Sequence, residues 1–249
     1  QKIRVAPRSA PGPVKNLPDE SAYGYVIKWQ SIRSAGVLAD LLKQGIKLRV
    51  AEEPFELNGI SFERGALLVL KTGNLSFGNS LWNRVAGVCN ERGVKMHAVK
   101  TGLVEKGNDF GSRRVAAVKA PSVVVLAGRD VNAAELGEVW HFFDRELNYP
   151  VSLVNTEDLE AIDWSRVNTL ILPDGQYTFL KNKMIRERLE AWINNGGKLI
   201  AMESAVEDIA ALNWGLRKRE PEEEDKEEKE EKAYQLLKKY NNRERDRLG

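Results

Sequence analysis

Cysteine and histidine are both scarce in this chain of 249 residues. Cys89 is the single cysteine, and His97 and His141 are the two histidines. One cysteine excludes a disulfide framework and a cysteine-rich zinc site. A catalytic zinc site needs three protein ligands, and no histidine follows the pair His141 and Asp144 on their predicted helix. We therefore expect no metal or other cofactor in this chain, and a buried structural role for Cys89.

Long apolar runs and a concentrated basic face are also missing. No stretch approaches the roughly 20 apolar residues of a membrane span, and the formal net charge is only +2. The sequence therefore gives no reason to expect a membrane span or a nucleic-acid partner. The chain begins at Gln1, and no basic segment followed by an apolar stretch marks a signal peptide. We expect such a chain to be a fragment or a processed product of a larger protein.

The first 104 residues predict a linker followed by a small α/β domain. Prolines are concentrated among charged and small residues in 1–21, which is typical of a linker. In 22–104, short apolar runs alternate with stretches of helical periodicity, and Asn58-Gly59 is the strongest short-range signal for a hairpin. The expected elements are strands at 23–29, 46–50, 55–57, 60–62, 66–70 and 95–99, and helices at 35–44 and 79–92.

Residues 105–121 are expected to connect this domain to a second α/β domain, residues 122–216. The latter opens with a continuous apolar run at 122–127, typical of a central parallel strand that is covered on both faces. Strands then alternate with helices, which predicts a doubly wound parallel sheet with right-handed crossovers. The further expected elements are strands at 151–154, 169–172 and 198–202, and helices at 132–147 and 181–194.

Residues 217–249 form a charged tail with 11 basic and 11 acidic side chains. Its first half is mainly acidic and its second half mainly basic, which complements the dipole of a helix. Three i,i+4 pairs have the acidic residue first, the favourable order: Glu222–Lys226, Asp225–Lys229 and Glu228–Lys232. The pattern favours a solvated helix with a narrow apolar stripe at Leu236, Leu237 and Tyr240. A disordered interaction tail is the alternative.

Three turns of the second domain fall where α/β folds bind ligands, beyond the carboxyl ends of parallel strands. Their candidate pocket residues are Gly128, Arg129, Asp174, Gly175, Glu203 and Ser204. Because the carboxyl ends of parallel strands share one edge of the sheet, we expect the three turns to lie close together.

Two segments of this domain resemble the class I glutamine amidotransferase-like domains. The strand at 169–172 runs into Pro173-Asp174-Gly175, which is similar to the LPGG turn of that family. Residues 196–205 resemble the strand and sharp turn that carry the family's nucleophilic cysteine. The resemblance covers residues 121 to about 212 and implies a flavodoxin-like fold.

The chain departs from that family at the catalytic residues. The register that fits best places Glu203 at the position of the nucleophile, and no histidine follows His141. Ser204 fits poorly, because its neighbours at the positions that need small residues are Met202 and Val206. A serine without an activating base is also a weak nucleophile. We therefore expect no catalytic residue in this domain.

Several longer segments resemble the region that follows the catalytic domain in large bacterial zinc carboxypeptidases of the carboxypeptidase A-like family. They are residues 23–30, 37–45, 110–113, 137–150 and 243–248. The resemblance implies a secreted or periplasmic parent hydrolase that removes C-terminal residues from peptides. The zinc and the peptide substrate would belong to an upstream catalytic domain in cis, because the family's His-x-x-Glu motif is absent here.

Two hypotheses for function follow from these patterns. The first is a non-catalytic accessory region of such a carboxypeptidase, which gives structural support or restricts substrates. The alternative is a small-molecule or peptide binding module that uses the three turns of the second domain.

If ion pairs hold the tail as a helix, its helical content will fall as salt is added. At about 1 M salt the Debye length shrinks to about 3 Å, which screens exposed ion pairs. We expect the far-UV circular dichroism of the full chain, minus that of a chain ending at residue 216, to lose helical signal between low salt and about 1 M salt. A difference spectrum that does not respond to salt would instead indicate docking through Leu236, Leu237 and Tyr240.

Overall fold

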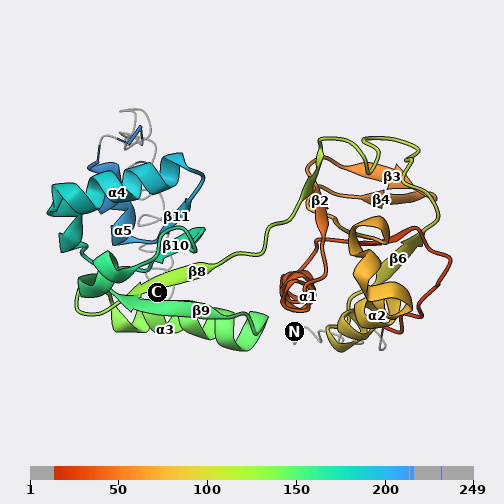
Figure 1. Cartoon of the computed structure of the whole chain (residues 1–249), viewed down its shortest axis with the longest axis horizontal. Coiled ribbons are helices and arrows are strands. Elements are labelled where there is room, and N and C mark those ends of the chain that lie inside the picture. Colours follow the sequence, from red (N-terminus) through yellow and green to blue (C-terminus); the bar gives the residue numbers. More distant parts are fainter. Residues whose placement is uncertain (1–13, 213, 216–230, 232–249) are drawn as a thin grey trace, which may run out of the picture. The chain divides into compact units, whose positions relative to one another are not determined.

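A five-stranded sheet, a four-stranded sheet and a two-stranded hairpin make up the β-structure of the described chain (Figure 1). The computed structural model describes residues 14–212, 214, 215 and 231. Contacts divide the chain between Ala205 and Val206, and all three sheets belong to the unit that ends at Ala205. The predictions for the tail at 217–249, and for residues 1–13 of the linker, lie outside the described residues, apart from residue 231.

The first sheet has the strand order β6-β1-β5-β2-β7, and every neighbouring pair in it is antiparallel. Its strands are Gly24–Ile27 (β1), Arg49–Ala51 (β2), Leu67–Leu70 (β5), Met96–Val99 (β6) and Val115–Ala117 (β7). Four of the five coincide with predicted strands. The fifth, β7, lies in the segment predicted as a connection, because three residues are too few to show a clear alternation.

The Asn58-Gly59 turn joins Phe55–Leu57 (β3) to Ile60–Phe62 (β4), as the sequence predicted. Asn58 has φ 54° and Gly59 has φ 69°. Positive φ at both central residues defines a type I′ turn, whose twist matches that of the flanking strands. The rings of Phe55 and Phe62 stack across the hairpin with their centroids 4.9 Å apart.

Helices cover one face of the first sheet and the hairpin covers the other. Ile32–Lys43 (α1) and Leu81–Glu91 (α2) pack in one apolar cluster with β1 and β5 side chains such as Tyr25 and Val69. The opposite cluster joins β3 and β4 to other side chains of the same strands, such as Val26 and Leu68. Because neighbouring residues of a strand point to opposite faces, each strand contributes to both clusters.

Cys89 of α2 is fully buried in the helix-side cluster, as expected from its apolar neighbours. Burial raises the pKa of its thiol to about 12. The thiolate form that reacts is therefore not available at neutral pH, and Cys89 has a packing role.

The second sheet is parallel throughout, with the strand order β11-β10-β8-β9. Its strands are Val123–Ala127 (β8), Val151–Asn155 (β9), Thr169–Leu172 (β10) and Lys198–Ala201 (β11). Along the chain, the inner strand β8 comes first and the edge strand β9 second. The chain then crosses to the other side of β8, where it forms the inner strand β10 and the edge strand β11. The inner strands β8 and β10 are buried along their whole length, whereas β9 and β11 are partly exposed. The predicted parallel sheet and its central strand are confirmed.

Three helices follow strands of this sheet: Ala133–His141 (α3) after β8, Lys183–Asn194 (α4) after β10, and Ser204–Ala210 (α5) after β11. The side chains of Asn132 and Asn182 cap α3 and α4 by accepting backbone N–H hydrogen bonds. The helix predicted at 132–147 is α3 continued by a π-helical turn, Phe142–Leu147. In the described part of the chain, no helix is both long enough and apolar enough to cross a membrane.

A single buried side chain holds the segment before β1 against the first sheet. Asn16, which is 3% exposed, donates from its amide nitrogen to Asn90 Oδ1 (2.9 Å) and to the Val94 carbonyl (2.8 Å). Its Oδ1 accepts from the Met96 N–H at 3.0 Å. Residues around Asn16, within the segment predicted as a linker, are therefore packed in place.

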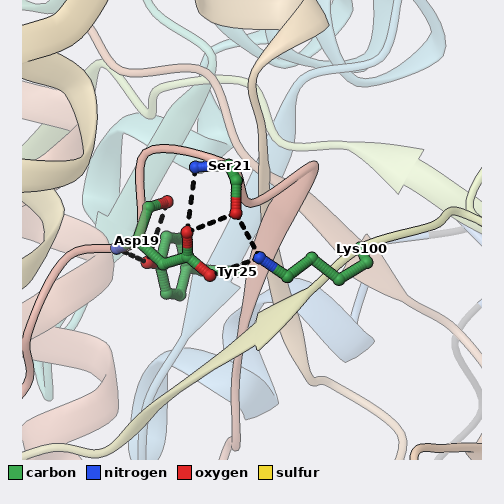
Figure 2. Close-up of polar contacts among 4 residues, drawn as sticks. All are labelled: Asp19, Ser21, Tyr25 and Lys100. Carbon is green, nitrogen blue, oxygen red and sulfur yellow. Dashed lines mark hydrogen bonds and ion pairs between the residues drawn. The ribbon is translucent and has the colours of Figure 1, made fainter.

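A polar network at Asp19 fixes the same segment further along (Figure 2). The Asp19 carboxylate pairs with the Lys100 ammonium and accepts from the Ser21 N–H (2.9 Å) and the Ser21 hydroxyl (2.5 Å). The Asp19 N–H donates to the Tyr25 hydroxyl at 2.6 Å. The hydrogen bond from Lys100, followed by those from Ser21, lowers the pKa of Asp19 to about 2.

This network makes the stability of the fold sensitive to acid. An unfolded aspartate has a pKa of about 3.9, so Asp19 stabilises the folded state above about pH 4, and the contribution is lost as the pH falls toward about 2. We expect Asp19→Asn to lower the urea midpoint at neutral pH, and the difference from wild type to vanish near pH 2. Glu63→Gln, which removes another exposed carboxylate, is the control. A difference that stays constant with pH would contradict this assignment.

Candidate functional site

The turns that follow β8, β10 and β11 lie at one edge of the parallel sheet, as the sequence predicted. The parallel register of the three strands places their carboxyl ends at the same edge, with Leu172 opposite Ala201 and Ile171 opposite Val125. The chain leaves each strand at this edge, so the polar residues of the turns are placed within reach of one another.

The turns after β8 and β10 are interlocked through their backbones. The Asn132 N–H donates to the Asp174 carbonyl and the Gln176 N–H donates to the Asp130 carbonyl, both at 2.8 Å. Gly175 is required here, because a Cβ at this position would collide with the Asp130 carbonyl oxygen. The two turns are therefore paired directly with each other.

Asp174 ties the third turn to the other two. Its Oδ1 accepts from the Ser204 N–H at 3.2 Å and from the Ser204 hydroxyl, and its Oδ2 accepts from the Asn132 side-chain amide at 3.2 Å. These hydrogen bonds, that of the Ser204 hydroxyl first, lower the pKa of the Asp174 carboxyl. One carboxylate therefore links the ends of β8, β10 and β11.

The hydroxyl of Ser204 is fully occupied by this arrangement. Its oxygen accepts from the Gly175 N–H at 3.2 Å, and its proton lies within reach of both Asp174 and the Gly175 carbonyl, the latter at 2.8 Å. A nucleophilic serine needs a base that removes its proton. Asp174 is a poor base at neutral pH because its pKa is lowered. The geometry therefore holds Ser204 as a structural hydrogen-bonding group.

Glu203 occupies the sharp turn between β11 and α5. Its φ is 49°, in the left-handed region that an L-residue with a side chain seldom adopts, and its side chain is exposed. A strained residue between a strand and a helix is the geometry of a nucleophile elbow. A carboxylate thus stands at the elbow position, and the N–H groups of Gly175 and Ser204 are taken by the Ser204 hydroxyl and by Asp174 instead.

Gly128 and Arg129 are not part of this cluster. Gly128 has φ 99°, and a Cβ there would meet the Asn155 side chain at 3.4 Å. The Arg129 guanidinium forms an exposed ion pair with Glu157, which follows β9. Of the six predicted pocket residues, the structure therefore joins Asp174, Gly175 and Ser204 directly and places Glu203 beside them. Cavities of about 790, 530, 530 and 280 Å³ in the described residues are lined by other side chains.

Two residues of this edge were not predicted as site residues. Asn132 caps α3 and also donates to Asp174, and Asp130 accepts from the Thr178 N–H (3.2 Å) and the Thr178 hydroxyl (2.8 Å). Asparagine and aspartate are common in turns and caps for local reasons. Their contacts to a distant turn therefore cannot be predicted from the sequence.

Metal ligands do not gather in the described residues: no group of three histidine, cysteine, aspartate or glutamate side chains is close enough to hold an ion. Comparisons of the chain with protein-family models, with curated proteins and with solved structures found no match. The arguments for function therefore depend on the geometry of the chain itself.

The strained backbone at Glu203 predicts how substitutions at this position change the free energy of unfolding. An L-residue in the left-handed region costs about 1–2 kcal/mol, and glycine avoids this cost. We expect Glu203→Gly to stabilise the fold by about 1 kcal/mol in urea unfolding. Glu190→Gly, at an exposed position within α4, is the matched control and should destabilise by about 1 kcal/mol. Equal losses at the two positions would show that the elbow is not strained.

Proposed function

We propose that this chain is a non-catalytic accessory region of a larger zinc carboxypeptidase of the carboxypeptidase A-like family. In that role it supports the upstream catalytic domain or restricts the substrates that reach it. The observation that carries the non-catalytic role is the elbow: a strand-to-helix turn with a left-handed residue holds a glutamate, Glu203, and a hydrogen-bonded serine, Ser204. The carboxypeptidase parent follows from the resemblance in sequence.

The order of the parallel strands supports an amidotransferase-like, flavodoxin-like domain. Numbered along the chain, the four strands lie in the order 2-1-3-4, read from β9 to β11. Flavodoxin-like sheets have this order, with a fifth strand beyond the fourth. The turns at their carboxyl edge are where such domains place their functional groups, and here those turns are closed on one another.

Zinc and the chemistry of peptide hydrolysis are assigned to the catalytic domain of the parent. The described residues offer no group of three ligands that fits a zinc ion, so no step of hydrolysis is attributed to this chain. The secreted or periplasmic location and the peptide substrate are likewise proposals for the parent, and they follow from the resemblance in sequence.

The alternative, a binding module that uses the three turns, receives less support from the geometry. The N–H groups of Gly175 and Ser204 and the carboxylate of Asp174 are satisfied by one another. A ligand that used these groups would have to replace existing hydrogen bonds, so the net gain on binding would be small.

Substitution at the elbow in the intact parent tests the proposal. We expect Glu203→Ala and Ser204→Ala each to leave peptidase turnover within about twofold, a change in barrier of about 0.4 kcal/mol. Ser204→Ala should lower the melting temperature, because it removes a hydrogen bond to Asp174.

The matched control is Glu190→Ala on α4, which removes an exposed carboxylate away from the three turns. A loss of turnover of about a hundredfold at Glu203 or Ser204, with the melting temperature unchanged and the control unaffected, would assign this domain a part in catalysis. The accessory role would then be abandoned.

A further inference from the structure

A small cavity in the first sheet combines positive charge with an apolar wall. It has a volume of about 280 Å³ and is lined by residues that include Lys47, Arg49, Leu70, Thr72, Gly73 and Ala117. In the sheet, Arg49 lies directly opposite Leu68 on one side and Ala117 on the other. Directly opposite residues share a face of a sheet, so the guanidinium stands beside the aliphatic side chains of its neighbours.

The two cations at this cavity have no acidic partner in the part of the chain that the structure describes. Neither Lys47 nor Arg49 belongs to an ion pair there, although Asp40, Asp19 and other carboxylates do pair with cations. Arg49 donates from Nη1 to the Val115 carbonyl at 3.2 Å, which leaves its other N–H groups for an external acceptor. Two neighbouring cations without a carboxylate favour an anionic ligand.

The walls of the cavity are held in place by a buried asparagine. Asn74, which is 3% exposed, donates from its amide nitrogen to the Lys47 carbonyl (2.9 Å) and the Leu70 carbonyl (3.0 Å). Its Oδ1 accepts from the Lys47 N–H at 2.8 Å. The segment before β2, which carries Lys47, and the end of β5 therefore keep a fixed separation, and binding would not require this part of the backbone to be ordered first.

Thr72 and Gly73, which are both exposed, line part of the cavity. No atom lies within 4 Å of the position that a Cβ would occupy at Gly73. Thr72 adds a hydroxyl donor to the lining, while Ala117, which is exposed, and the edge of Leu70 supply the apolar part. Apolar surface on one side and cations on the other match a ligand that carries both an aliphatic group and an anionic head.

We propose that this cavity binds a small carboxylate with an aliphatic group, its head on Lys47 and Arg49 and its chain against Leu70 and Ala117. An arginine guanidinium is planar and its paired N–H groups match the two oxygens of a carboxylate. The ligand is either a free aliphatic acid or the C-terminal residue of a peptide, since both present this chemistry. The inference is independent of the elbow and of the accessory role proposed above.

Titration of the full chain with four small probes tests the site and identifies the source. The probes are hexanoate, N-acetylleucine, N-acetylleucine amide and hexanol, followed by backbone amide chemical shifts in NMR. We expect saturable shifts at Leu70, Thr72 and Gly73 with the two carboxylates, and at least about tenfold weaker binding of the amide and the alcohol. Tighter binding of hexanoate would indicate a free acid, and tighter binding of N-acetylleucine would indicate a peptide terminus.

Two kinds of variant separate the contribution of the two cations to binding from that of the cavity volume. Lys47→Ala with Arg49→Ala should weaken carboxylate binding at least about tenfold, equivalent to about 1.4 kcal/mol. The double variant Arg64→Ala with Lys95→Ala removes two exposed cations that do not line the cavity, and it should bind as wild type does. Ala117→Phe keeps both cations but fills the cavity from Ala117, the exposed last residue of β7, and it should also abolish binding.

Amide spectra of each variant show whether it is folded, so a loss of binding is counted only for folded protein. The proposal is overturned if the carboxylates cause no saturable shifts at these residues. It is also overturned if hexanol binds as well as hexanoate, or if the folded Lys47 and Arg49 variant binds as wild type does.

Discussion

The carboxylate of Asp174 is the group on which the functional edge of the second sheet depends. It accepts from Ser204 after β11 and from Asn132 after β8, while its own residue follows β10. Strand pairing aligns the three strands but does not determine how their turns end. A single ion with two oxygens can satisfy donors from two directions, and it thereby sets the paths of three turns at once. The same hydrogen bonds occupy the groups that an active elbow would need to keep available.

Most of the elements could be predicted because their patterns are local. The apolar run at β8, the turn at Asn58-Gly59 and the glycines that end α1 and α2 each act within a few residues. The antiparallel direction of the first sheet could not be predicted in the same way, because a strand's own sequence does not record its partner. Strand β7 was missed because its pairing with β2, which is distant in the sequence, decides it. The helix predicted at 132–147 was right in position, but its last turn is π-helical.

The position of the candidate site could be predicted from the sequence, but the hydrogen bonding of its side chains could not. The likeness of residues 196–205 to an elbow placed Glu203 in the turn, and its φ of 49° agrees with that placement. Whether Ser204 is free or bound depends on Asp174, which lies 30 residues earlier in the chain. The cavity at Lys47 and Arg49 was missed for a similar reason, since its walls come from β2, β5 and β7, which are separated in the sequence.

The two regions differ in how their polar groups are satisfied, and this difference bears on function more directly than the fold does. At the elbow, the donors and acceptors of the three turns are hydrogen-bonded to one another. A ligand would therefore gain little beyond the hydrogen bonds that it replaced. At the cavity, two cations face space without a carboxylate from the described residues. An anion bound there would be attracted by both positive charges. A parallel sheet whose turns are hydrogen-bonded to one another at one edge can therefore keep that edge as structure, while a ligand site lies elsewhere in the chain.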